Sequence, residues 1–161
     1  NKFWKGGSKL NNKCEYEFNK GTLAIIPNGK ESSLIYEDES RYIIEDNPLN
    51  IMEGSCKYFG STFDGRIQGA KDILGAEYKV PIIIEDSNNL VVFPTSSPRS
   101  NDCCWISLNR VDNIYRIDND NTKIVFDNER EIIVPCSFRS IENQFSRASR
   151  LKTVLHKRKN S

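Results

Sequence analysis

Short apolar segments separated by turn residues run through most of this chain, and they restrict the folds that it can adopt. Residues 22–26 end at a Pro-Asn-Gly turn, and residues 33–36 and 41–44 flank an acidic turn as the arms of a hairpin do. Strand-like segments continue further along the chain, at residues 80–84, 90–93, 105–108, 113–117, 123–126 and 131–134. Strands this short and this closely spaced predict a mostly antiparallel sheet.

Three other segments have the spacing of helices. Pro48 suits the first turn of a short helix, and residues 63–74 place apolar side chains at helical spacing before the stop signal Gly75. After Pro135, Ser137 suits the N-cap of a helix whose apolar face comprises Ile141, Phe145, Ala148 and Leu151. The sequence therefore predicts an α+β fold: mostly antiparallel β-sheet, short central helices and a C-terminal basic amphipathic helix.

Length and composition indicate the organisation of the chain. Its 161 residues, 37% hydrophobic and 28% charged, suit one soluble globular domain. We expect a flexible N-terminal segment at 1–15, a single domain at 16–152 and a basic tail at 153–161. No apolar run approaches the ~20 residues that cross a bilayer, and residues 1–13 lack the apolar centre of a secretory signal. The expected location is the cytoplasm, without a membrane partner.

The net charge of +1 hides an uneven distribution. Residues 1–30 hold six lysines against two glutamates, and residues 31–46 hold six acidic residues against one arginine. Residues 139–161 hold seven lysines and arginines against one glutamate. Such separation indicates a polyanionic partner or a self-complementary assembly, with a merely solvated tail as the alternative.

Residues 54–71 combine basic, aromatic and glycine residues with a single carboxylate. Glycines let a backbone come close to another molecule, whereas Tyr58, Phe59 and Phe63 are expected to pack in the core rather than stack on bases. Lysine and arginine neutralise phosphates and release counterions, and arginine also enters narrow A·T-rich minor grooves. The candidate DNA contacts are Lys57, Arg66, Lys71, Arg99, Arg139, Arg147 and Arg150. For Arg147, Arg150 and Lys152 a solvated helix face is the alternative.

Catalytic and metal-binding patterns are weak in this chain. Residues 60–65 resemble a phosphate loop, but the Lys-Ser/Thr pair that such a loop needs is replaced by Arg66 and Ile67. His156 is the single histidine, so a Cys–His or Ser–His pairing is not favoured. The cysteines Cys14, Cys56, Cys103, Cys104 and Cys136 form no C-x-x-C pair and predict reduced, buried thiols. We expect no cofactor, no metal site and no enzymatic activity.

Four separated motifs carry a family resemblance: residues 55–63 with Gly65-Arg66, residues 79–83, residues 93–96 with 105–107, and residues 142–145 with Arg147-Ala148. Together they closely resemble the ComK family, competence transcription factors of Gram-positive bacteria. The resemblance implies a DNA-binding activator of genes for DNA uptake and recombination. It further implies binding to paired AT-rich boxes, largely through the minor groove, by dimers that assemble further. It also implies an adaptor that delivers the protein to an ATP-dependent protease.

A second function class remains open at this point. The acidic residues 31–46 suit docking onto a basic protein partner, so the chain is alternatively a protein-interaction module whose DNA contact is incidental.

Overall fold

The computed structural model describes residues 16–161, and the segment expected to be flexible, 1–15, lies outside the described residues. The strands are β1 (Thr22–Pro27), β2 (Ser33–Glu37), β3 (Arg41–Ile44), β4 (Ile82–Glu85), β5 (Leu90–Pro94), β6 (Trp105–Ser107), β7 (Val111–Arg116), β8 (Thr122–Phe126) and β9 (Glu131–Val134). The helices are α2 (Pro48–Tyr58), α3 (Phe63–Leu74), a 3-10 turn η1 (Leu108–Arg110) and α4 (Phe138–Lys159). Leu108, expected at the end of a strand, instead begins η1.

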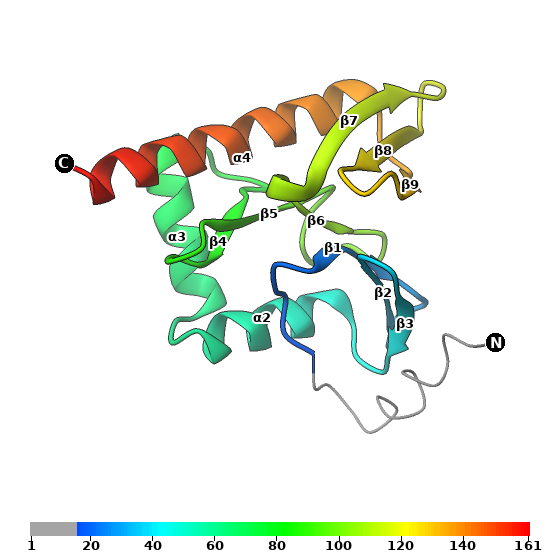
Figure 1. Cartoon of the computed structure of the whole chain (residues 1–161), viewed down its shortest axis with the longest axis horizontal. Helices are drawn as coiled ribbons and strands as arrows, with labels where there is room; N and C mark the ends of the chain where they lie inside the picture. The colour runs from blue at the N-terminus through cyan, green and yellow to red at the C-terminus, as the bar shows by residue number, and fades with distance from the viewer. Residues whose placement is uncertain (1–15) are drawn as a thin grey trace.

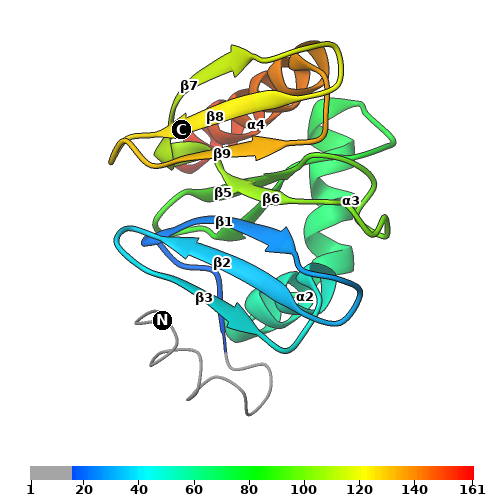
Figure 2. The same ribbon diagram turned by 90° about the vertical axis from the view of Figure 1, so that its right-hand side faces the viewer.

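The strands pair antiparallel, as the sequence predicts, and they form two sheets, a division that the sequence does not predict. Six strands pair in the order β3-β2-β1-β6-β5-β4, and three pair in the order β7-β8-β9. The larger sheet consists of two three-stranded meanders joined where Ala24 and Ile25 of β1 face Ile106 and Trp105 of β6. Figure 2 shows the strands of both sheets stacked in front of the helices. The α+β fold class with a C-terminal helix is confirmed.

Both faces of the larger sheet are covered, which explains the continuous apolar run of β5. Val91 and Phe93 belong to a core cluster with α3, α4 and the smaller sheet, whereas Leu90 and Val92 belong to a second cluster that includes residues of α2. Neighbouring side chains of a strand point to opposite faces, so each cluster takes alternate residues. Figure 1 shows α4 on one side of β4, β5 and β6, and α2 on the other.

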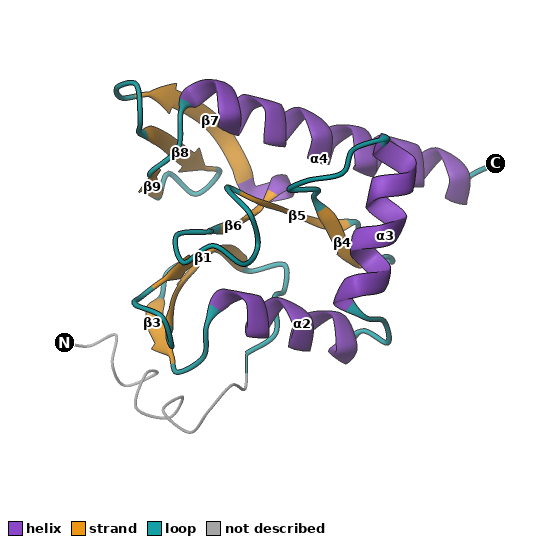
Figure 3. Cartoon of the chain, turned by 180° about the vertical axis from the view of Figure 1, so that it is seen from behind, coloured by secondary structure: helices purple, strands orange, loops and turns teal. Residues whose placement is uncertain are grey.

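Local signals begin α4 and end α3 where the sequence predicts. The Ser137 hydroxyl accepts from the Ser140 amide at the start of α4, and Gly75 ends α3 in the left-handed conformation, with φ of 63°. A non-glycine residue is disfavoured at such a φ. The helix α4 continues through Lys159, so most of the segment expected as a basic tail is helical. Seen from behind in Figure 3, α3 connects the layer of α2 to that of α4.

Two arginines next to the smaller sheet, Arg110 of η1 and Arg130 of the turn between β8 and β9, hold the acidic hairpin β2–β3. Arg110 donates to Asp38, to Asp127 and to the Lys20 carbonyl. Arg130 donates to the carbonyls of Glu37 and Ser40, at 2.7 and 2.9 Å. Hydrogen bonds to Asp127 and Asp38 raise the pKa of Arg110, which keeps it charged. Part of the acidic surface thus has its basic partner within the chain.

Candidate nucleic-acid interface

The seven candidate DNA contacts lie on four parts of the fold. Lys57 is exposed in the last turn of α2, and Lys71 is partly buried in the last turn of α3. Arg66 of α3 is also partly buried, and its Nε is buried without a hydrogen-bond partner among the described residues. Arg99 is exposed in the loop between β5 and β6. Arg139, Arg147 and Arg150 lie on α4.

Three basic residues meet at one hollow, here called the linker groove. It lies between α3, residues 75–81 that link α3 to β4, and the loop after β5, and its volume is about 310 Å³. Lys71, Lys79 and Arg99 line it, together with the carboxylates of Asp64 and Glu77. The remaining lining residues include Leu49, Phe63, Ile67, Val80 and Pro98. The groove therefore combines apolar side chains with three cations, which come from α3, the linker and the β5–β6 loop.

A second hollow, the helix hollow, adjoins the linker groove along α4. It measures about 330 Å³ and is lined by Lys79, Ser140, Asn143, Gln144, Ser146 and Arg147. Lys79 lines both hollows, so they form one continuous surface. This surface brings four basic residues together, two of α3 and α4 and two of loops. It does not include Lys57, Arg66, Arg139 or Arg150.

Two of the predicted phosphate contacts bind the chain's own backbone. Arg147 Nη1 donates to the Tyr78 carbonyl at 2.8 Å, and Arg150 Nη1 donates to the Leu74 carbonyl at 3.2 Å. Lys152 Nζ donates to Asn109 Oδ1 at 2.9 Å. These basic side chains thus fasten α4 to its neighbours and do not form a purely solvated helix face.

Two residues that line the linker groove, Lys79 and Tyr78, are not among the candidates that the sequence predicts. Tyr78 is 79% exposed, the highest value among the large hydrophobic residues at 16–161. Lys79 belongs to the motif of residues 79–83, but nothing in the local pattern indicates that its side chain or that of Tyr78 lies beside other basic residues. Only the packing of α3, α4 and the β5–β6 loop places them at the groove.

The three aromatics of residues 54–71 separate into two groups. Phe59 and Phe63 pack against the second core cluster, and the Phe63 ring meets Trp105 edge to face at 5.9 Å. The expectation of core packing is confirmed for these two. It is wrong for Tyr58, which is 67% exposed at the end of α2. A helix end leaves the side chain on its outer side without a neighbour to cover it.

The cysteines of residues 16–161 are all free thiols, and three of them are buried. Burial raises the pKa of Cys56 and of Cys103 to about 11 and that of Cys104 to about 12. The pKa of the half-buried Cys136 is also raised, mainly by burial. Because the thiolate is the nucleophile, a raised pKa makes a thiol unreactive at neutral pH.

We expect the native protein to react slowly with a thiol reagent at pH 8. With a pKa near 11, only roughly one thiol in a thousand is ionised there. In a Cys14→Ser variant, Ellman's reagent should modify Cys136 first and reach Cys56, Cys103 and Cys104 only after denaturation. The rate should rise with pH up to the raised pKa values. Fast native modification of Cys104, located by mass spectrometry, would contradict this assignment.

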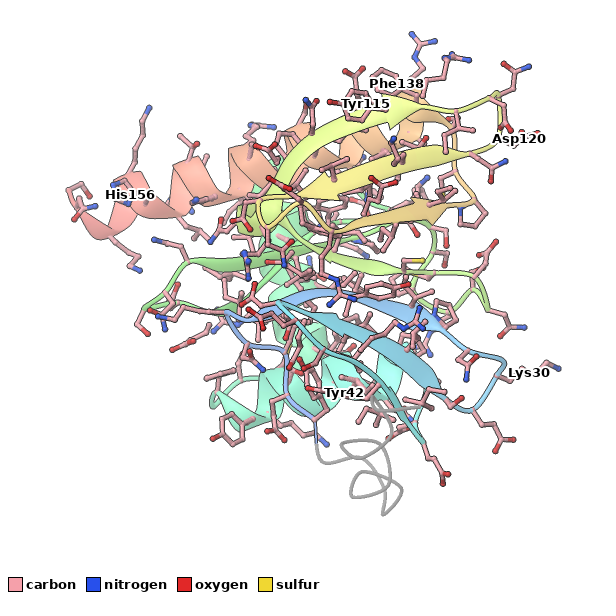
Figure 4. All side chains as sticks on the ribbon, turned by 45° about the vertical axis from the view of Figure 1, so that its right-hand side comes forward. Lys30, Tyr42, Tyr115, Asp120, Phe138 and His156 are labelled. Carbon is pink, nitrogen blue, oxygen red and sulfur yellow. The ribbon has the colours of Figure 1, made fainter. Side chains whose placement is uncertain are left out.

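Within residues 16–161, no three histidine, cysteine or acidic side chains are arranged to hold a metal ion. Figure 4 shows His156 near the C-terminal end of α4, well away from the labelled Asp120. None of the helices that the structure describes is long and apolar enough to cross a bilayer.

Two antiparallel sheets packed against helices, with basic residues gathered at the linker groove, define an α+β protein whose candidate site is a basic surface. A family model described as "ComK protein" matches residues 13–160. The "Competence transcription factor" of Bacillus subtilis (strain 168) is 34% identical over 146 residues, which cover 89% of this chain and 76% of that relative. The chain belongs to the ComK family, which confirms the resemblance. No solved structure matches the chain significantly.

Proposed function

We propose that this chain is a DNA-binding regulator that activates competence genes. The similar Bacillus subtilis protein is named a competence transcription factor, and the chain covers three quarters of its length. The observation that carries the proposal is the meeting of Lys71, Lys79 and Arg99 at the linker groove. Cations from several segments on one surface suit a continuous phosphate backbone.

The proposed target is duplex DNA with paired AT-rich boxes, contacted largely through the minor groove. An exposed arginine on a loop, such as Arg99, suits a narrow A·T groove because the negative potential is strongest there. Paired boxes further require two or more copies of the chain, so we propose that it binds DNA as a dimer or larger assembly. Lys57, Arg66 and Arg139 lie outside the two hollows and are proposed as flanking backbone contacts.

A gel-shift titration of the full chain tests this proposal. The probes are a duplex with two AT-rich boxes, a duplex with one box and a GC-rich duplex of equal length, each at several salt concentrations. We expect tighter and cooperative binding to the paired boxes, with affinity that falls as salt rises. Equal affinity for the AT-rich and GC-rich duplexes would overturn the proposed target. Strong retention of a protein partner with only weak, sequence-independent DNA binding would favour the interaction module.

A further inference from the structure

The linker between α3 and β4, residues 75–81, is held by side chains of α4 through its carbonyl groups. Gln144 is 2% exposed, and its Nε2 donates to the carbonyls of Lys79 and Pro94, both at 2.7 Å. Arg147 Nη1 donates to the Tyr78 carbonyl at 2.8 Å and to Gln144 Oε1 at 3.2 Å. The linker backbone is therefore fixed at two successive carbonyls, those of Tyr78 and Lys79.

The backbone conformation of the linker agrees with its being held in place by α4. Lys79 has φ of 52°, in the left-handed region. A non-glycine residue in this region costs free energy and persists where its surroundings determine it. The bonds from Gln144 and Arg147 supply those surroundings. The side chains of Tyr78 and Lys79 are consequently presented at the linker groove by a backbone that α4 holds in one shape.

The exposed ring of Tyr78 is the feature that this arrangement presents. It lines the linker groove together with Lys71, Lys79 and Arg99, yet 79% of the residue is exposed. A large ring left in water beside three cations suits a partner that is anionic at its rim and apolar inside. The minor groove of DNA is such a partner, since proteins insert apolar side chains between its base steps while basic residues contact the phosphates.

We infer that Tyr78 is a specificity-determining residue that reads DNA deformability from the minor groove, and that Arg147 positions it through the linker backbone; this rests on the proposed function. Pyrimidine–purine steps such as TA unstack easily, so a ring inserted at a step favours sequences that contain them. Tyr78 thus discriminates between DNA sequences at a base step without a hydrogen bond to the edge of a base. Arg147 donates a hydrogen bond to a carbonyl of the linker, so it contributes to DNA affinity through the shape of the linker and not by neutralising a phosphate.

A phosphate contact and a positioning residue predict different changes in the dependence of DNA affinity on salt. Loss of a phosphate contact makes the slope of log affinity against log salt shallower by about one. Loss of a positioning contact leaves that slope unchanged and lowers the preference for deformable DNA. The slope and the AT-to-GC affinity ratio, measured together, therefore separate phosphate contacts from residues that act on the shape of the linker.

The experiment compares Tyr78→Ala, Tyr78→Phe, Arg147→Ala and Lys79→Ala with the wild-type chain on AT-rich and GC-rich duplexes. We expect Tyr78→Ala and Arg147→Ala each to lower the AT-to-GC ratio about tenfold with the slope unchanged. Tyr78→Phe should retain the ratio. Lys79→Ala should make the slope shallower by about one. Tyr58→Ala is the matched control, since Tyr58 is also exposed but lies outside the groove.

Two results would overturn the inference while leaving the proposed function intact. One is a Tyr78→Ala chain that prefers AT-rich DNA as strongly as the wild-type chain does. The other is a shallower slope for Arg147→Ala, which would make Arg147 a phosphate contact. Thermal unfolding of each variant shows whether it is folded, and Tyr78→Ala, compared with Tyr78→Phe and Tyr58→Ala, keeps the test decisive if Arg147→Ala unfolds. A wild-type chain without preference for AT-rich DNA would overturn the proposed AT-rich target and, with it, this inference.

Discussion

Replacement of Lys71, Lys79 and Arg99 together by alanine is expected to weaken binding to AT-rich duplex DNA by about 100-fold or more at about 0.1 M salt. Each phosphate that a cation neutralises contributes about −0.9 to the slope of log affinity against log salt. Between about 1 M and about 0.1 M salt, each contact therefore increases the affinity for DNA by somewhat less than tenfold. All three side chains line the linker groove, so one variant removes the groove's cations. Asp64 and Glu77 remain there and oppose the phosphates.

A variant with the same change of charge elsewhere controls for the field of the whole protein. Lys20, Lys157 and Arg158 are exposed and lie outside the linker groove. Their triple replacement by alanine should leave most of the affinity intact and reduce the slope much less. A gel shift or fluorescence anisotropy titration at several salt concentrations measures both quantities. Equal losses in the two triple variants would show that net charge, and not the groove, drives binding.

Trp105→Ala is expected to lower the free energy of unfolding by about 4 kcal/mol. Trp105 is fully buried in β6, facing Ile25 of β1 and Pro94 of β5 across the sheet. Its ring also meets Phe63 of α3. Removal of this side chain opens a cavity at the junction of the two meanders, where several elements would have to move to fill it. Urea denaturation followed by circular dichroism measures the change.

Trp105→Phe separates the packing of the ring from its polar group. Trp105 Nε1 is buried and has no hydrogen-bond partner among the described residues, so phenylalanine removes an unpaired donor while keeping an aromatic ring. We expect this variant to lose only about 1–2 kcal/mol. A Trp105→Ala chain as stable as the wild type would show that the two meanders do not depend on this contact.

Wherever a signal is contained within a few residues, the sequence predicts the local structure well. The stop of α3 at Gly75 and the N-cap of α4 at Ser137 were predicted because a left-handed residue and a capping hydroxyl act on neighbouring backbone groups. Strand β4 begins at Ile82 and not at residue 80. Pro81, which lacks an amide donor, directly precedes it. The hydrogen-bonded pairing of strands decides where such a strand begins, and the apolar pattern of one segment does not show this pairing.

The candidate site was predicted in part. Lys71 and Arg99 were expected and do lie together at the linker groove, whereas Lys57, Arg66 and Arg139 lie apart from it. Lys79 and Tyr78 were missed, because their position depends on bonds from Gln144 and Arg147, more than sixty residues further along the chain. No pattern within a short window signals such a contact.

The sequence by itself determined the class of fold, the order of strands and helices, the family and the surplus of basic residues, because these follow from local spacing, composition and motifs. Only the tertiary structure decided which strands join the two meanders, which arginines bind carbonyls of the chain itself and which cations share a groove. The physical reason is that the hydrophobic effect is non-directional, so apolar side chains are buried together whatever their separation in the sequence. It brings α3, α4 and the β5–β6 loop together, and the candidate site lies where these three parts meet.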